Sequence, residues 1–206
     1  MKILFYILSA VIGYLIGSIS FAVIIGKLFY KKDVRESGSK SAGATNVLRT
    51  LGKKAAIAVT IGDLLKGIIA YLVAKPLGNI CGAGEICAII SGVFAVLGHN
   101  YPVFFGFRGG KGVLTSLAFS FMIDPRGAIL ALLFAIIIMA ITKYVSLGSM
   151  LGCALNAVVI WFLVPGEYIK IIAIVFLAIL AIVKHKENIK RLLKGEERKL
   201  GNKEPK

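Results

Sequence analysis

The feature that most limits this chain is the run from Ile3 to Gly26, which holds 24 residues without a charged side chain. An α-helix needs roughly 20 such residues to cross the hydrocarbon core of a bilayer. The apolar part of a secretory signal peptide has only about 7–15 residues. Lys27 and the pair Lys31-Lys32 end the run, as in a stop-transfer signal. The run therefore predicts an N-terminal membrane span.

Further apolar segments follow, separated by signals for helix ends. Hydrophobic residues make up 58% of the chain, against roughly 45–50% in soluble domains. The pattern predicts an all-α integral membrane protein with about seven transmembrane helices. We expect one domain over residues 1–206, with a polar tail after about residue 196. The fourth segment is short, so five or six spans also fit the sequence. The predicted spans are 3–27, 55–75, 85–106, 112–123, 127–142, 146–164 and 168–183.

Positive charge is concentrated beside these spans. The formal net charge is +15, from 25 Lys and Arg against 10 Asp and Glu. Eight basic residues lie between Lys27 and Lys54, and nine between Lys184 and Lys206. Basic segments next to spans stay in the cytoplasm, so seven spans place the N-terminus outside and the C-terminus inside. We expect a multi-pass protein of the cytoplasmic membrane that attracts anionic lipids or substrates and binds no nucleic acid.

One polar segment, "DVRESGSKSAGATNVLR" at residues 33–49, is too polar to span a membrane. A helix that begins near Ala44 would offer unpaired N–H groups to a phosphate. The alternative is a solvated loop followed by an interfacial helix. The candidate substrate-binding side chains are Ser39, Thr45, Asn46 and Arg49.

A second polar segment is "GHNYPVFFGFRGGKG" at residues 98–112. It places Arg108 and Lys111 among Gly109, Gly110 and Gly112. Backbone N–H groups around a cation can form an anion-binding cradle, here ahead of the fourth span. The nucleotide P-loop pattern is absent, because a phenylalanine occupies the place of its first glycine. The alternative is a tight turn between helices with two cytoplasmic cations.

Two charged residues, Asp63 and Lys66, lie near the middle of the second span. Each costs about 2.5–3.5 kcal/mol at a helix centre on insertion scales. Because they are three residues apart, they can neutralise one another. We expect them to give structural support. His99 is interpreted as a polar residue that packs between helices.

Polar residues also lie at the start of the sixth span and after the last one. They are Ser146, Ser149, His185 and Asn188. His185 and Asn188 are three apart, so they share one face of a helix. Alternatively, the serines allow close helix packing, and the tail is a basic interfacial anchor. The three cysteines show no metal-ligand spacing, so we expect no metal.

Four sequence blocks together resemble the bacterial acyl-phosphate:glycerol-3-phosphate acyltransferases. The blocks are "GSKSAGATNVLRTLGKK", "DLLKG", "GHNYPVFFGFRGGKGV" and "HKENIKRLLKGEE". They occur in order and cover nearly the whole chain, which is far more specific than any one block. The chain departs from the usual pattern at Lys40, Ser41 and Lys186.

The resemblance implies a seven-helix membrane fold with its active site at the cytoplasmic face. It also implies an acyl phosphate donor and an sn-glycerol-3-phosphate acceptor. The products would be 1-acyl-glycerol-3-phosphate (lysophosphatidic acid) and inorganic phosphate, in the first acylation of phospholipid biosynthesis. We expect no cofactor, membrane lipids as partners and a functional monomer.

On this reading, both substrates carry phosphate, so cations and N–H groups must bind them. We expect Ser39, Arg49, Lys111 and the Gly109–Gly112 backbone to bind the phosphates, with Thr45, Asn46, Arg108 and Ser146 as further substrate-binding residues. The expected catalytic residues are Lys111, Ser149, His185 and Asn188. His185 is a candidate general base, and proton transfer to a phosphate oxygen is the alternative.

Two other functions remain open at the level of the residues. An anion transporter would need charges along a midplane path, where the chain offers Asp63 and Lys66. A structural scaffold would have no need for the glycine-rich segment around Lys111.

Overall fold

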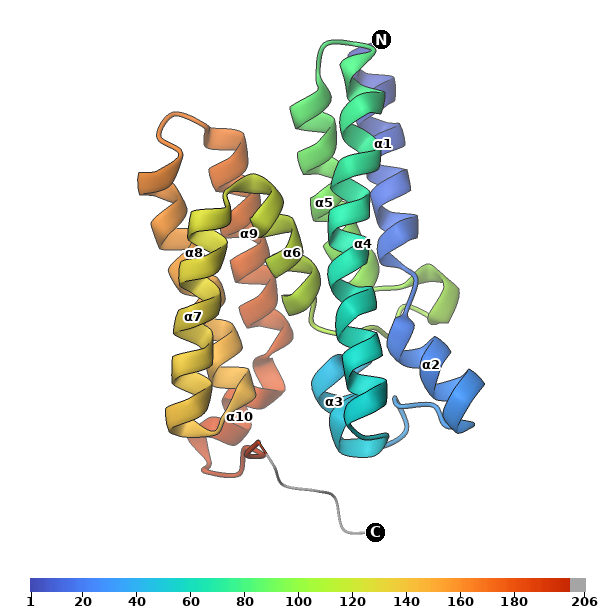
Figure 1. Ribbon diagram of the computed structural model, residues 1–206, viewed down its shortest axis with the longest axis vertical. Helices are drawn as coiled ribbons and strands as arrows, with labels where there is room; N and C mark the ends of the chain where they lie inside the picture. Colours follow the sequence, from blue (N-terminus) through green and yellow to red (C-terminus); the bar gives the residue numbers. More distant parts are fainter. Residues whose placement is uncertain (201–206) are drawn as a thin grey trace. The chain divides into compact units, whose positions relative to one another are not determined.

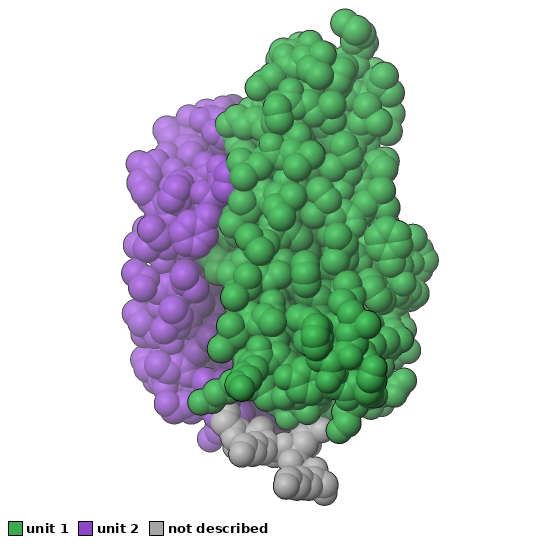
Figure 2. All heavy atoms as spheres, turned by 45° about the vertical axis from the view of Figure 1, so that its right-hand side comes forward, with its two compact units in different colours: residues 1–119, 203–206 green, residues 120–202 purple. Residues whose placement is uncertain are grey.

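The structure is a computed structural model that describes residues 1–200, and every regular element in that range is a helix (Figure 1). The predicted all-α class is confirmed, and each predicted apolar segment contains a helix. The chain divides into two compact units, Met1–Phe119 and a second that begins at Ser120 (Figure 2). The single domain stays a prediction. The predicted polar tail is described as far as Leu200, and the rest of it lies outside the described residues.

The first unit is built around three long helices, α1, α4 and α5, which pack against one another (Figure 1). Its elements are α1 (Lys2–Gly17), α2 (Phe21–Tyr30), α3 (Ala44–Thr50), α4 (Lys53–Asn79), α5 (Gly84–Asn100), the 3-10 helix η1 (Val103–Phe105) and most of α6 (Val113–Ile123). A Cβ at Gly13 or Gly17 would overlap the backbone of Ser91 or Ala95 on α5. This spacing of small residues lets two membrane helices approach closely.

The first predicted span, 3–27, is not one helix. α1 ends at Gly17 and α2 begins at Phe21, with the buried Ser18 between them. The interruption leaves the carbonyl of Ile19 to accept a hydrogen bond from Lys66 Nζ at 3.2 Å. A buried ammonium in an apolar bundle needs such an acceptor, which gives a physical reason for the break.

The second unit contains the end of α6 and four further helices. They are α7 (Pro125–Thr142), α8 (Val145–Leu163), α9 (Tyr168–Lys184) and α10 (Lys186–Leu193). α7 begins two residues earlier than the predicted 127, because Asp124 caps it: its carboxylate accepts from the N–H groups of Arg126 and Gly127 at 2.9 and 3.1 Å. Gly148 and Gly152 bring α8 against Ala131 and Ala135 of α7.

Length and composition make five stretches able to cross a membrane, or six if one bent pair counts as a span. They are Lys2–Tyr30, Lys53–Asn79, Gly84–Phe105, Pro125–Thr142 and Val145–Leu163, with Tyr168–Lys184 and Lys186–Leu193 as the pair bent by 56°. α6 is apolar but has only 11 residues. The count of seven spans therefore stays a prediction.

Candidate functional site

The polar loop, residues 31–43, is anchored by two buried side chains. Val34 and Ala42 are 0% and 2% exposed and pack with Val47 of α3 and Val59 of α4. Burial of these apolar side chains fixes the loop against the ends of two helices. Ser39, which the sequence predicts to bind substrate, is half-buried on this loop.

Asn46 holds the polar loop in shape. Its side-chain amide donates to the carbonyls of Val34 at 2.7 Å and Ser37 at 3.2 Å, and its Oδ1 accepts from the N–H of Ser39 at 2.8 Å. Asn46 is 1% exposed. Its side chain pairs backbone groups of the loop that would otherwise be unpaired. The predicted role of Asn46 in substrate binding stays a prediction.

α3 begins at Ala44, the start that the sequence analysis considered, and carries two further candidates. Thr45 and Arg49 are four residues apart, so they lie on the same face of this helix. Both are half-buried.

The glycine loop, residues 105–112, is packed against the C-terminal end of α5. The N–H of Gly110 donates to the carbonyl of His99 at 3.1 Å, and the carbonyl of Gly109 accepts from the N–H of Ala42 at 3.3 Å. A Cβ at Gly110 would overlap the imidazole of His99. The N–H of Gly110 is thus paired with a protein carbonyl in this structure, and the predicted role of Gly110 in phosphate binding stays a prediction.

The glycine loop leads directly into α6. Gly112 has a left-handed φ of 77°, and a Cβ there would stand 2.7 Å from Asn100 Oδ1, so only glycine fits. Its carbonyl accepts from the N–H of Ser116 at 2.8 Å, which starts the helix. The loop therefore lies at the N-terminus of α6, as predicted, with Lys111 half-buried and Arg108 exposed.

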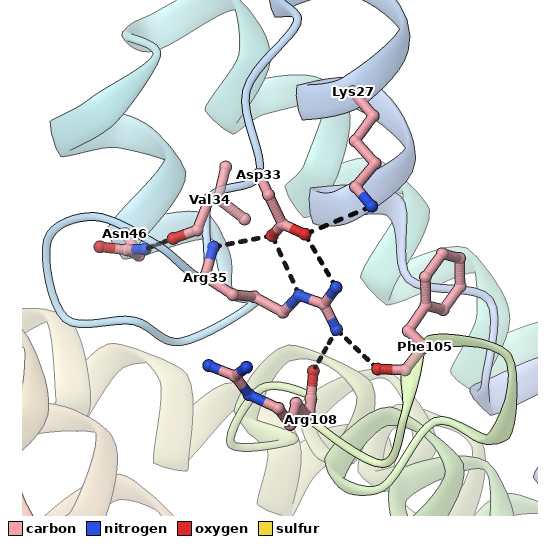
Figure 3. A network of polar contacts seen from close by, with 7 residues as sticks. All are labelled: Lys27, Asp33, Val34, Arg35, Asn46, Phe105 and Arg108. Carbon is pink, nitrogen blue, oxygen red and sulfur yellow. Dashed lines mark hydrogen bonds and ion pairs between the residues drawn. The ribbon is translucent and has the colours of Figure 1, made fainter.

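Arg35 connects the two loops and is not among the predicted site residues. Its guanidinium contacts both carboxylate oxygens of Asp33 and the carbonyl oxygen of Phe105 (Figure 3). The hydrogen bonds from Arg35 hold the pKa of Asp33 well below its ordinary value, against the opposing effect of burial. An Asp and an Arg two residues apart in a glycine-rich polar loop is the signal that could have identified this pair.

A buried charge cluster lies next to the glycine loop. Lys66 Nζ lies 2.9 Å from Asp63 Oδ1, and His99 Nδ1 lies 3.4 Å from the same oxygen. The hydroxyl of Thr115 on α6 donates to the backbone carbonyl of Asp63 at 3.1 Å. The pairing that the sequence spacing allows is therefore present, and it ties α4 to α5 and α6. The supporting role of Asp63, Lys66 and His99 stays a prediction.

In the second unit, Glu197 accepts hydrogen bonds from two of the predicted site residues. Its Oε1 accepts from Ser146 Oγ at 2.8 Å and from Asn188 Nδ2 at 2.6 Å, while its Oε2 accepts from Arg191 Nε at 2.8 Å. Burial pushes the pKa of Glu197 upward, but the three donors outweigh it and leave the pKa below its ordinary value. Sequence reasoning missed Glu197, because an acidic residue in a basic tail is typical of a solvated surface.

The other two candidates of this unit bond to their own helices. Ser149 Oγ donates to the carbonyl of Val145 at 2.8 Å. His185, between α9 and α10, has its Nδ1 2.7 Å from the carbonyl of Ala181. A carbonyl only accepts, so in the neutral ring Nδ1 carries the hydrogen and Nε2 carries the lone pair. Within residues 1–200, no group of three or more His, Cys, Asp or Glu is placed to hold a metal.

The chain matches the glycerol-3-phosphate acyltransferase family over residues 7–195. A glycerol-3-phosphate acyltransferase of Clostridioides difficile (strain 630) is 42% identical over 204 residues, which covers 98% of this chain and 99% of the relative. One of Thermoanaerobacter pseudethanolicus (strain ATCC 33223 / 39E) is 46% identical over 204 residues, with 97% and 98% covered.

Two crystal structures of PlsY (YgiH), an integral membrane glycerol 3-phosphate acyltransferase, have the same fold. The glycerol 3-phosphate form is 38% identical with a TM-score of 0.87, covering 95% of this chain and 96% of that chain. The lysophosphatidic acid form is 37% identical with a TM-score of 0.83, covering 95% of each. The likeness extends over both compact units.

Proposed function

Because the chain belongs to the glycerol-3-phosphate acyltransferase family, we propose that it transfers a fatty acyl group from acyl phosphate to the 1-hydroxyl of sn-glycerol-3-phosphate. It is a multi-pass integral membrane acyltransferase. The products of the proposed reaction are lysophosphatidic acid and inorganic phosphate, without a cofactor, in the first acylation of phospholipid synthesis. Support comes from the relative whose structures are described as glycerol 3-phosphate and lysophosphatidic acid forms.

The proposed topology has seven spans in the cytoplasmic membrane, with α6 as the short span. The N-terminus lies outside and the tail inside. The two basic stretches support this orientation, because Lys and Arg beside spans remain in the cytoplasm. Both polar segments then face the cytoplasm, where water-soluble glycerol-3-phosphate is available.

The observation that carries the proposal is the position of Lys111. It lies on a glycine loop that is fixed to α5 and the polar loop, directly before the N-terminus of α6. A helix N-terminus and a lysine both attract a phosphate. We assign phosphate binding to Lys111 with Arg108, Arg49, Thr45 and Ser39, and to the N–H groups of Gly109 and Gly112.

The chemistry requires one bond to form and one to break. The glycerol hydroxyl oxygen attacks the acyl carbonyl carbon, and the resulting tetrahedral oxyanion collapses with loss of phosphate. Phosphate is a good leaving group, so no protein nucleophile is needed. Ser149, Asn188 and Ser146 are proposed to orient the acceptor, and Lys111 to stabilise negative charge in the transition state.

The hydroxyl proton must leave during the attack. Nε2 of His185 is the proposed acceptor, because Nδ1 is oriented by the carbonyl of Ala181. The competing route passes the proton to an oxygen of the phosphate itself.

The direct test is phosphate release from palmitoyl phosphate by purified protein, with and without glycerol-3-phosphate. We expect release that requires the acceptor and is lost in Lys111→Ala. Lys54→Ala is the control, because Lys54 is an exposed lysine of the basic stretch Lys27–Lys54, and it should keep full activity. Folded wild-type protein without acceptor-dependent release would contradict the proposal and favour anion transport.

A further inference from the structure

Arg35 joins the polar loop to the glycine loop through a single planar group. Its Nη1 donates to the carbonyl of Phe105 at 2.6 Å and, more weakly, to that of Arg108 at 3.4 Å. Its Nε and Nη2 donate to the two carboxylate oxygens of Asp33 at 3.0 and 2.8 Å (Figure 3). The side chains of Asp33 and Arg35 are only 11% and 13% exposed. Such a fork of donors in fixed directions is specific to arginine.

The segment between the two carbonyls that Arg35 contacts has an unfavourable backbone conformation. Phe107 has a left-handed φ of 58°, which is unfavourable for a residue that carries a Cβ. Its N–H donates to the carbonyl of Pro102 at 2.9 Å. The two carbonyls that Arg35 contacts lie on either side of Phe107 in the chain. Arg35 therefore helps to hold a turn that its own sequence does not favour.

Two further hydrogen bonds hold the glycine loop between this turn and Lys111. The carbonyl of Gly109 accepts from Ala42 of the polar loop, and the N–H of Gly110 donates to His99 of α5. Two of the three attachments, Arg35 and Ala42, thus come from the polar loop, which also carries Ser39. The polar loop therefore helps to fix the path of the glycine loop.

We propose that Arg35, oriented by Asp33, is a positioning residue that sets Lys111 for binding the phosphate of the acceptor. The inference rests on the proposed function. Arg35 acts through the carbonyls of Phe105 and Arg108 rather than on the substrate itself.

The primary test is Arg35→Lys. Lysine keeps the positive charge beside Asp33, but it cannot donate to the carboxylate and to both carbonyls in fixed directions. We expect the KM for glycerol-3-phosphate to rise by about tenfold, with a smaller fall in kcat, because Lys111 also stabilises negative charge in the proposed transition state. The unfolding midpoint of the variant should stay close to that of the wild type.

Arg126→Lys is a matched control. Asp124 and Arg126 have the same two-residue spacing and similar contacts, with Arg126 Nη2 2.7 Å from Asp124 Oδ2 and 3.2 Å from the carbonyl of Leu163. This pair caps α7, and its hydrogen bonds go to α7 and to the end of α8. Its replacement should leave the KM for glycerol-3-phosphate unchanged. Lys27→Gln is a second control, because Lys27 contacts Asp33 at 3.4 Å with a side chain that is 58% exposed.

A KM within about twofold of wild type in Arg35→Lys would overturn the inference, as would loss of kcat at constant KM or an equal effect of Arg126→Lys. If Arg35→Lys does not fold, Asp33→Asn is the replacement test, and the KM for glycerol-3-phosphate is again the criterion. This variant keeps the guanidinium of Arg35 and removes the carboxylate that orients it. Stabilisation of the folded protein by glycerol-3-phosphate gives a second readout without turnover. Because this measurement needs no turnover, it distinguishes failure of the inference about Arg35 from failure of the proposed acyl transfer.

Discussion

The side-chain nitrogen of Lys66 lies 3.2 Å from the backbone carbonyl of Ile19, at the point where the first membrane segment is interrupted. The same ammonium lies 2.9 Å from Asp63, and both side chains are nearly fully buried. A charge in this environment is tolerated only where its partners are all present. The broken helix and the buried ion pair are therefore parts of one arrangement.

Replacement of Lys66 by Met should destabilise the protein strongly, because Asp63 would keep a buried charge without its lysine. Removal of one partner of a buried pair costs about 3–5 kcal/mol. The double variant Asp63→Asn, Lys66→Met should recover much of this loss, since both charges are gone. Thermal unfolding in detergent measures the effect.

Lys75→Met is the comparison for this measurement. Lys75 lies 3.2 Å from Glu85, but its side chain is 47% exposed, so its loss should cost less than about 1 kcal/mol. Equal losses in Lys66→Met and Lys75→Met would show that the buried pair does not hold α4 in place.

The helical fold could be predicted because a bilayer leaves an apolar segment few alternatives. Backbone groups in lipid must pair within the segment, so a long uncharged run forms a helix. The segment predicted at 127–142 is observed as Pro125–Thr142. Its early start depends on the side chain of Asp124, a local signal that the apolar pattern does not contain.

Contacts between residues far apart in the sequence explain the features that the sequence did not predict. The break after Gly17 depends on Lys66, 47 residues from the carbonyl that it contacts. Glu197 reaches Ser146 across 51 residues, and no periodic pattern reports such a pairing. Asn46 has the chemistry of a ligand-binding residue, but only the path of the polar loop shows that its amide is turned inward.

The lowered pKa of Glu197 predicts a loss of stability in acid. A carboxylate with a lowered folded-state pKa stabilises the protein fully above its ordinary pKa, near ~4.3, and this contribution disappears as the pH falls toward the lowered value. Glu197→Gln should therefore be less stable at neutral pH and show a smaller change in its unfolding midpoint on acidification. Part of the slope should remain, because Asp33 also has a lowered pKa.

Glu187→Gln is the control for the acid dependence. Glu187 pairs with Lys190 at 3.4 Å, with exposed side chains on both sides, so its contribution to stability is small. A Glu197→Gln variant with the same acid dependence as Glu187→Gln would show that the contacts of Glu197 with Ser146, Asn188 and Arg191 do not stabilise the second unit.

His185→Gln separates the two routes for the hydroxyl proton. If Nε2 of His185 accepts it, kcat should fall by about 10²–10⁴-fold, the usual contribution of a general base. Glutamine keeps a polar side chain of similar length, so the fold should survive. Turnover near the wild-type rate with an unchanged pH profile would exclude histidine as the base, and proton transfer to phosphate would then be the mechanism that fits.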